Sequence, residues 1–132
     1  MTDRIDLEVP ASVRSLSAVR MVLGGLGARL DFSIDDVEDL FLATGELLRA
    51  ALHAEALERL RVEAEIDGSG LRLAMGVFNS PDLRRAVEVT PHGEECLDLC
   101  TLLHGTIDEV EIDERDAAYC VVLVKRRAGD AA

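Results

Sequence analysis

Four residues in the second half of the chain have the types and spacing of metal ligands. His92, Cys96, Cys100 and His104 recur at intervals of four residues, and side chains four residues apart lie on one face of a helix. Thiolate and imidazole are ligands that zinc prefers. Each successive ligand is displaced by about 40° around the helix, so two could share one ion but all four could not. We favour the alternative, in which the cysteines are small buried residues and His104 lies at the C-terminal end of a helix.

Glu46 and Arg49 are a second group of residues that could do chemistry. They lie within a helix predicted for residues 33–56. Ser33 is a suitable N-cap, and acidic residues crowd the first turn, where the helix dipole favours negative charge. Glu46 and Arg49 interrupt a wide apolar face, although such long side chains can also reach solvent. The apolar face has the 3.6-residue period of a helix and consists of Ile34, Val37, Leu40, Phe41, Thr44, Leu47, Leu48, Ala51 and Leu52.

Composition restricts the class of protein. The chain has 132 residues, 48% of them hydrophobic and only 3% aromatic, and its net charge is −12. This length suits one domain with an aliphatic core. The acidic surface repels phosphate backbones and disfavours direct binding of nucleic acid. The cysteine count is odd, and neither a signal peptide nor an apolar run of membrane-spanning length is present, so we expect a soluble cytoplasmic protein with reduced thiols.

The hydrophobic period changes along the chain and predicts alternating groups of helices and strands. Gly24, Gly25 and Gly27 fall in the second half of the first predicted helix, where they either permit close approach of another backbone or end the helix. The predicted elements are a strand at 4–9, helices at 13–30 and 33–56, a hairpin of 60–66 and 71–77, a loop at 82–93 with a possible helical turn at 81–86, a helix at 94–103 closed by His104 and Gly105, and a hairpin of 107–112 and 117–125.

Two features of this order determine the predicted fold. Tight turns join the later strands, which excludes parallel winding, and the helices come in groups. We therefore expect an α+β fold with helices on one face of a mostly antiparallel sheet. The run from Cys120 to Val124 is apolar throughout, so its strand should be central or buried on both faces. Residues 1–127 form one predicted domain, and residues 128–132 a disordered tail.

Over residues 7–125 the sequence resembles the anti-sigma-factor serine kinases of bacteria, which belong to the Bergerat-fold (GHKL), histidine-kinase-like ATPase superfamily. The resemblance lies in residues 9–11 before the first helix, in residues 34–40 leading to Glu46, and in residues 106–110 entering the last hairpin. It implies a two-layer sandwich of three main helices on a mixed sheet that holds ATP between the helices and a loop. Proteins of this type sequester a sigma factor and phosphorylate an antagonist protein on serine. The resemblance also implies a homodimer.

The first family motif lies on the central helix. The resemblance places Glu46 as the catalytic base, and an asparagine that holds Mg²⁺ should follow four residues later. Here that position is Ala50, whose methyl group cannot coordinate a cation that requires oxygen ligands. His53 stands one position before the expected histidine, about 100° away around the helix. Arg49 could approach a phosphate of the cofactor, but it could also be an ordinary surface residue.

The other two motifs are also altered. An Asp-x-Gly-x-Gly turn that recognises adenine is replaced by residues 75–81, where only Asn79 could contact the base of the cofactor. A glycine-rich segment that cradles phosphates corresponds to residues 92–97, which keep one glycine and include Glu94 and Glu95. Glycines are required there because backbone N–H groups must approach the anion, and two carboxylates at that distance would repel ATP.

These departures predict a regulator that binds a sigma factor, a small anti-sigma antagonist or both, and whose ATP binding and serine kinase activity are weak or lost. No cofactor is expected unless the altered site still binds Mg-ATP. The candidate site residues are Glu46 for catalysis and Arg49 and Asn79 for the cofactor, with no metal site. Two alternatives remain open: an active serine-protein kinase with a non-standard ATP site, and a small metal-binding domain built on His92, Cys96, Cys100 and His104.

Overall fold

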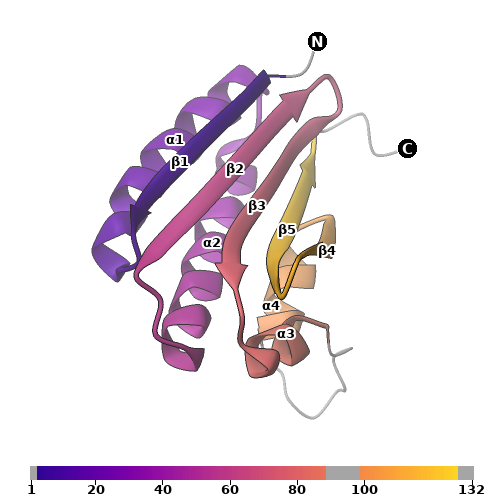
Figure 1. Ribbon diagram of the computed structural model, residues 1–132. Coiled ribbons are helices and arrows are strands. Elements are labelled where there is room, and N and C mark those ends of the chain that lie inside the picture. The colour runs from indigo at the N-terminus through magenta and orange to yellow at the C-terminus, as the bar shows by residue number, and fades with distance from the viewer. Residues whose placement is uncertain (1–2, 89–98, 128–132) are drawn as a thin grey trace.

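The computed structural model describes residues 3–88 and 99–127. They form two layers, in which one antiparallel sheet is covered on one side by helices (Figure 1). The strands are β1 (Asp3–Pro10), β2 (Arg59–Asp67), β3 (Gly70–Phe78), β4 (Glu109–Arg115) and β5 (Ala118–Arg126). The helices are α1 (Leu16–Arg29), preceded by a 3-10 turn at Val13–Ser15, and α2 (Ile34–Ala54), α3 (Pro81–Glu88) and α4 (Leu99–Thr106). The α+β prediction is confirmed, and every described strand pair is antiparallel.

The strand order is β1-β2-β3-β5-β4, so β5 lies inside the sheet and β1 and β4 form its edges. Both predicted hairpins are present, β2 with β3 and β4 with β5. At the first turn Asp67 accepts hydrogen bonds from the N–H groups of Ser69 and Gly70, as expected for an aspartate that starts a turn. The interior position of β5 confirms the prediction drawn from its continuous apolar run.

Helix α2 begins with a reciprocal capping box. The hydroxyl group of Ser33 accepts a hydrogen bond from the N–H of Asp36, and the carboxylate of Asp36 accepts one from the N–H of Ser33. The predicted apolar face then points into the core at Leu40, Leu47 and Leu48. Ile34 is an exception, since it is 78% exposed in the first turn of the helix.

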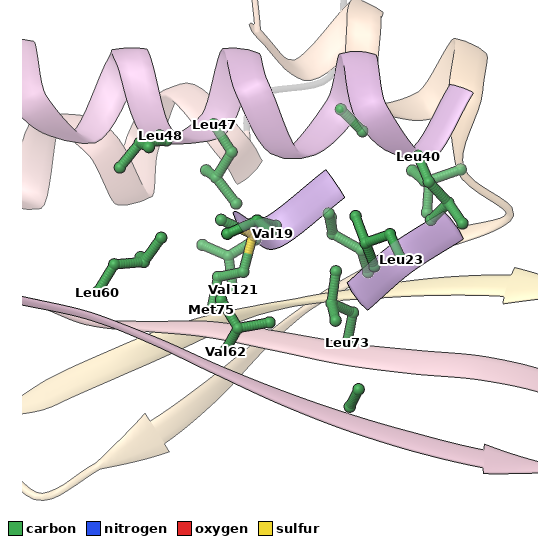
Figure 2. Packing of buried hydrophobic residues seen from close by; sticks show 14 of the residues in the cluster. Val19, Leu23, Leu40, Leu47, Leu48, Leu60, Val62, Leu73, Met75 and Val121 are labelled. Carbon is green, nitrogen blue, oxygen red and sulfur yellow. The ribbon is translucent and has the colours of Figure 1, made fainter. Parts of the chain in front are cut away.

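The core lies between the helices and the sheet. Figure 2 shows Leu60, Val62 and Met75 pointing from the sheet toward Leu47 and Val19 on the helices. Each of these five side chains is 0–2% exposed. Full burial of an aliphatic side chain contributes about 1.5–3 kcal/mol, so this aliphatic interface stabilises the fold although the chain has few aromatic residues.

The structure corrects three predictions. The sequence predicts a loop at 82–93 with a helical turn at 81–86, and the structure extends that turn to the helix α3 at Pro81–Glu88, because Ser80 accepts a hydrogen bond from the N–H of Leu83 and so caps a helix that buries Leu83 and Val87. Helix α4 runs through His104 and Gly105 to Thr106 instead of closing at them. In the strict alternation expected of the predicted strand 71–77, Val77 has the same phase as Leu73 and Met75. The register between β3 and β5 shifts between Met75 and Phe78, so Phe78 enters the core and Val77 lies on the other side of the sheet.

Residues 89–98 and 128–132 lie outside the described parts of the chain, so the predicted tail and the start of the helix predicted at 94–103 stay predictions.

Of the three glycines predicted to affect the first helix, Gly27 permits the closest packing. All three lie within α1, which does not end at them. A Cβ atom on Gly27 would lie 2.7 Å from Cγ2 of Val37 on α2, whereas a Cβ atom on Gly25 would have no neighbour within 4 Å. Val37 is β-branched and therefore has little freedom to move aside.

Substitution by alanine should therefore change the free energy of unfolding in opposite directions at Gly27 and at Gly25. Gly27→Ala should lower the free energy of unfolding by about 1 kcal/mol, since overpacking outweighs the gain in helix propensity. Gly25→Ala is the matched control and should raise it by up to about 1 kcal/mol. Urea unfolding of both variants measures the difference. Equal stabilisation by the two substitutions would show that α1 and α2 are not in close contact at this point.

Candidate functional site

Glu46 and Arg49 lie on α2 and pair with each other. Nη1 of Arg49 is 3.1 Å from Oε1 of Glu46, and their side chains are 46% and 39% exposed. Ala50, one turn after Glu46, packs against the core and offers only a methyl group, and His53 is exposed. The structure thus brings Glu46 and Arg49 together. It places no oxygen ligand for Mg²⁺ at the position where the family motif requires one.

A second arginine, which the sequence analysis did not identify, lies beside this pair. A Cβ atom on Gly45 would be 3.2 Å from Nη1 of Arg49 and 4.0 Å from Nη2 of Arg20. The guanidinium carbon of Arg20 is also 5.7 Å from the ring centroid of Phe41, within the range of a cation–π contact. Gly45 therefore leaves room for two guanidinium groups on the outer side of α1 and α2. A glycine in the middle of a long helix was the signal in the sequence for this close approach.

Asn79 lies at the junction of β3 and α3, and its backbone is already engaged. The N–H groups of Asn79 and Ser80 donate to Oε2 of Glu55 at 2.9 and 2.8 Å. Glu55 is the C-cap residue of α2, so its carboxylate ties the end of that helix to the start of α3. Glu55 is nine residues after Glu46, which corresponds to about 13 Å along a helix. Asn79 is thus anchored at the C-terminal end of α2, apart from Glu46, and its own side chain is exposed.

Tyr119 on β5 contacts the same β3–α3 junction from the side of the core. Its hydroxyl group donates to the carbonyl oxygen of Ser80 at 2.6 Å, and its ring packs edge-on against Phe78 with centroids 6.0 Å apart. Burial, together with the negative charge of Glu55, raises the pKa of Tyr119 to about 12, while the guanidinium of Arg84 opposes that shift. The junction where the family motif would contact adenine is therefore fixed by Glu55 and Tyr119. Neither residue was identified from the sequence, because neither belongs to a motif.

The predicted phosphate segment, residues 92–97, lies outside the described residues, as do His92 and Cys96. Of the four candidate zinc ligands, Cys100 is buried and His104 is exposed. Within residues 3–88 and 99–127, no three His, Cys, Asp or Glu side chains are grouped as a metal site requires. The alternative of a metal site that uses some of these four residues therefore stays a prediction.

Comparisons with known proteins support the resemblance seen in the motifs. No family model matches the sequence. Over 44 residues the chain is 36% identical to the serine-protein kinase RsbW of Bacillus velezensis, a match that covers 33% of this chain and 28% of that protein. The chain resembles RsbW. Its fold also matches a solved structure of the RsbU and RsbW domains of Rv1364c from Mycobacterium tuberculosis, with a TM-score of 0.62, 14% identity, and coverage of 94% of this chain and 32% of that chain.

Both matches cover only part of the other protein. The chain matches less than a third of the length of the RsbW relative and about a third of the solved chain. The structural match establishes a shared two-layer fold, and the local identity to RsbW agrees with the family resemblance of the motifs. In the described part of the chain, no helix combines the length and apolar character needed to cross a bilayer.

The buried hydrogen bond of Tyr119 predicts a loss of stability at high pH. An ordinary tyrosine ionises near pH 10, whereas in the fold the pKa of Tyr119 is raised from 10.0 to about 12. The fold favours the neutral phenol, so its contribution to the free energy of unfolding is complete below pH 10 and is lost as the pH rises to about 12. Denaturant unfolding across this range should show the decline.

Tyr119→Phe is the control for this titration. This variant should lack the part of the decline that comes from ionisation of Tyr119. At neutral pH its free energy of unfolding should be lower by about 1–2 kcal/mol, because the carbonyl of Ser80 loses its donor. An identical decline in both proteins would contradict the assignment to Tyr119.

Proposed function

We propose that this chain is an anti-sigma-factor-like regulator that acts by binding protein partners, a sigma factor, a small antagonist protein or both, and that its ATP binding and serine kinase activity are weak or lost. One observation carries the proposal. The fold is shared with an RsbW-containing structure, and on α2 the carboxylate of Glu46, which the resemblance assigns as the base, pairs with Arg49, while the residue at the position that the resemblance assigns to the metal ligand is Ala50. Such a site lacks the oxygen donor that would hold Mg-ATP.

The outer side of α1 and α2 is the surface we propose for the partner. Three apolar residues on or just before these helices are exposed, namely Met21 at 78%, Leu42 at 45% and Val13 at 49%. Arg20 lies over the ring of Phe41 on the same helices. Protein interfaces are enriched in Met, Arg and aromatic residues. Arg20 and Arg49 converge here, but α2 also carries five carboxylates, so the exposed apolar residues are what this surface offers a partner segment.

Titration with Mg-ATP tests the loss of nucleotide binding. Calorimetry should show no micromolar binding to this chain, since one metal ligand is missing and the junction at Asn79 is held by internal hydrogen bonds. An RsbW protein assayed in parallel serves as a positive control for the titration. Micromolar binding, together with phosphate transfer to serine of an antagonist protein, would instead favour the active-kinase alternative.

Affinity capture with site-directed variants tests the partner surface. The immobilised chain should retain a sigma factor or a small antagonist from extract of its own cells, identified by mass spectrometry. Met21→Asp and Leu42→Asp should each reduce capture about tenfold or more, because they place negative charge on the apolar part of the surface. Ala54→Asp, an exposed position at the end of α2, should leave capture unchanged. Equal capture by all four proteins would exclude this surface.

Cytoplasmic location and homodimer formation complete the proposal; the first rests on the cysteine count and the sequence pattern, and the second on the resemblance alone.

A further inference from the structure

Strand β4 leaves one edge of the sheet open. It is the last strand in the order β1-β2-β3-β5-β4, and Figure 1 shows it at the opposite side of the sheet from β1. In the part of the chain that the structure describes, no strand pairs with its outer edge. An unpaired edge carries backbone N–H and C=O groups that can pair with another chain. We call residues 109–115 the β4 edge.

The ladder between β4 and β5 determines which backbone groups of the β4 edge are free. Arg115 and Ala118 are paired across a two-residue turn, and the residues that flank such a turn exchange hydrogen bonds. Hydrogen-bonded pairs alternate along an antiparallel ladder, so every second residue before Arg115 also directs its backbone groups to β5. The N–H and C=O groups of Val110, Ile112 and Glu114 therefore point away from the sheet.

A hollow lies beside the β4 edge. Its volume is about 410 Å³, and it is lined by His104 near the end of α4 together with Asp108, Glu109, Val110 and Glu111. Three of these residues are carboxylates, and none is an arginine or a lysine. The hollow therefore suits a positively charged side chain of a bound segment.

The side chains of the β4 edge differ between the two sides of the sheet. Val110 and Ile112 are half-buried and pack against the main core. Glu109 and Glu111 point to the side away from the helices, where they are 50% and 45% exposed. The side chains of an added strand alternate in the same way and lie beside those of its neighbour. Such a strand fits best when its apolar residues contact Val110 and Ile112 and its basic residues contact the two glutamates.

Charge favours a basic partner over a second copy of this chain. Residues 108–115 include five carboxylates and one arginine. Arginines of β3, α3, β5 and β4 pair with four of these carboxylates, whereas Asp108 makes no ion pair within residues 3–88 and 99–127. Exposed ion pairs contribute little, so the carboxylates can accept further cations. Two β4 edges side by side would instead place like charges opposite each other, which is destabilising.

We propose that the β4 edge binds an extended segment of a protein partner, in which basic and apolar residues alternate, by adding it to the sheet as a further strand. Backbone hydrogen bonds to Val110, Ile112 and Glu114 hold the segment, and the hollow beside His104 receives one of its basic side chains. This surface is distinct from the outer side of α1 and α2, and the proposal does not rest on the regulatory function proposed above.

Binding of synthetic peptides to the full chain tests this proposal. A capped, fluorescent peptide of alternating lysine and valine has the length of β4, seven residues. Fluorescence anisotropy should give it a dissociation constant below about 1 mM. A peptide with glutamate in place of lysine should bind at least about tenfold more weakly. So should a lysine peptide N-methylated at its valines, which keeps the charge but loses the N–H donors that face the β4 edge.

Two variants locate the binding on the sheet. Glu111→Lys should raise the dissociation constant of the lysine–valine peptide about tenfold, because it places a repelling charge on the β4 edge. Glu65→Lys on β2 is the matched control and should leave it unchanged. The two glutamates are 45% and 44% exposed, and each pairs with an arginine. Circular dichroism verifies that both variants fold.

Amide hydrogen exchange provides a second measurement. When the lysine–valine peptide is added, the N–H groups of Val110, Ile112 and Glu114 should exchange more slowly, whereas those of β1 at the other edge of the sheet should not change. Absence of binding at millimolar peptide would overturn the proposal. So would equal binding of the three peptides, or equal weakening by Glu111→Lys and Glu65→Lys. Protection of Val110 and Ile112 that grows with protein concentration in the absence of peptide would assign the β4 edge to a second copy and would also overturn it.

Discussion

Aliphatic contact between α2 and the sheet holds the two layers of this protein together. Leu40, Leu47 and Leu48 have no exposed surface, and Figure 2 shows Leu47 above Met75 and Val121 of the sheet. The chain has few aromatic residues, so many small contacts supply the stabilisation, each contributing about 1.5–3 kcal/mol per buried side chain. Because the inner face of α2 is used in this way, the charged residues of the helix are confined to its ends and its outer side.

That division determines the chemistry available on α2. Glu46 and Arg49 are on the outer side, where they form an exposed ion pair. A surface pair of this kind contributes little stability, so the fold does not depend on it. At the end of the same helix Glu55 accepts two backbone hydrogen bonds from the β3–α3 junction. The helix thus links the outer surface proposed for partners to the β3–α3 junction.

The apolar residues on the two sides of the sheet are covered in different ways. On the inner side, helices exclude water from Leu60, Val62 and Met75. On the side of the sheet that faces away from the helices, arginines and carboxylates from three strands extend over a smaller apolar cluster. The guanidinium group suits this arrangement because it is planar and forms paired hydrogen bonds with a carboxylate. Most cations of the chain are arginines, and its single lysine, Lys125, is instead buried beneath the helices.

Sequence alone determined the elements that depend on local preference and period. Ser33 and the acidic turn after it define the start of α2, and alternating residues with a Gly-containing turn define the β2–β3 hairpin. The residue type at position 50 is read directly from the sequence, and an alanine there offers no oxygen to a metal ion. Only a helical turn at 81–86 could be predicted from the sequence, because the segment is short and the full helix at Pro81–Glu88 depends on the Ser80 cap and on two residues that are buried in the fold.

Only the tertiary structure decided which distant groups meet. The contacts of Glu55 with Asn79 and of Arg115 with Glu63 join residues 24 and 52 positions apart, and no local period encodes such a pairing. The same holds for the inward turn of Phe78, which depends on the register between β3 and β5. Local propensity acts over a few residues, whereas the side chains that assemble a site or a surface are chosen by how whole elements pack. For this reason the sequence determined the elements, and the packing determined the surfaces.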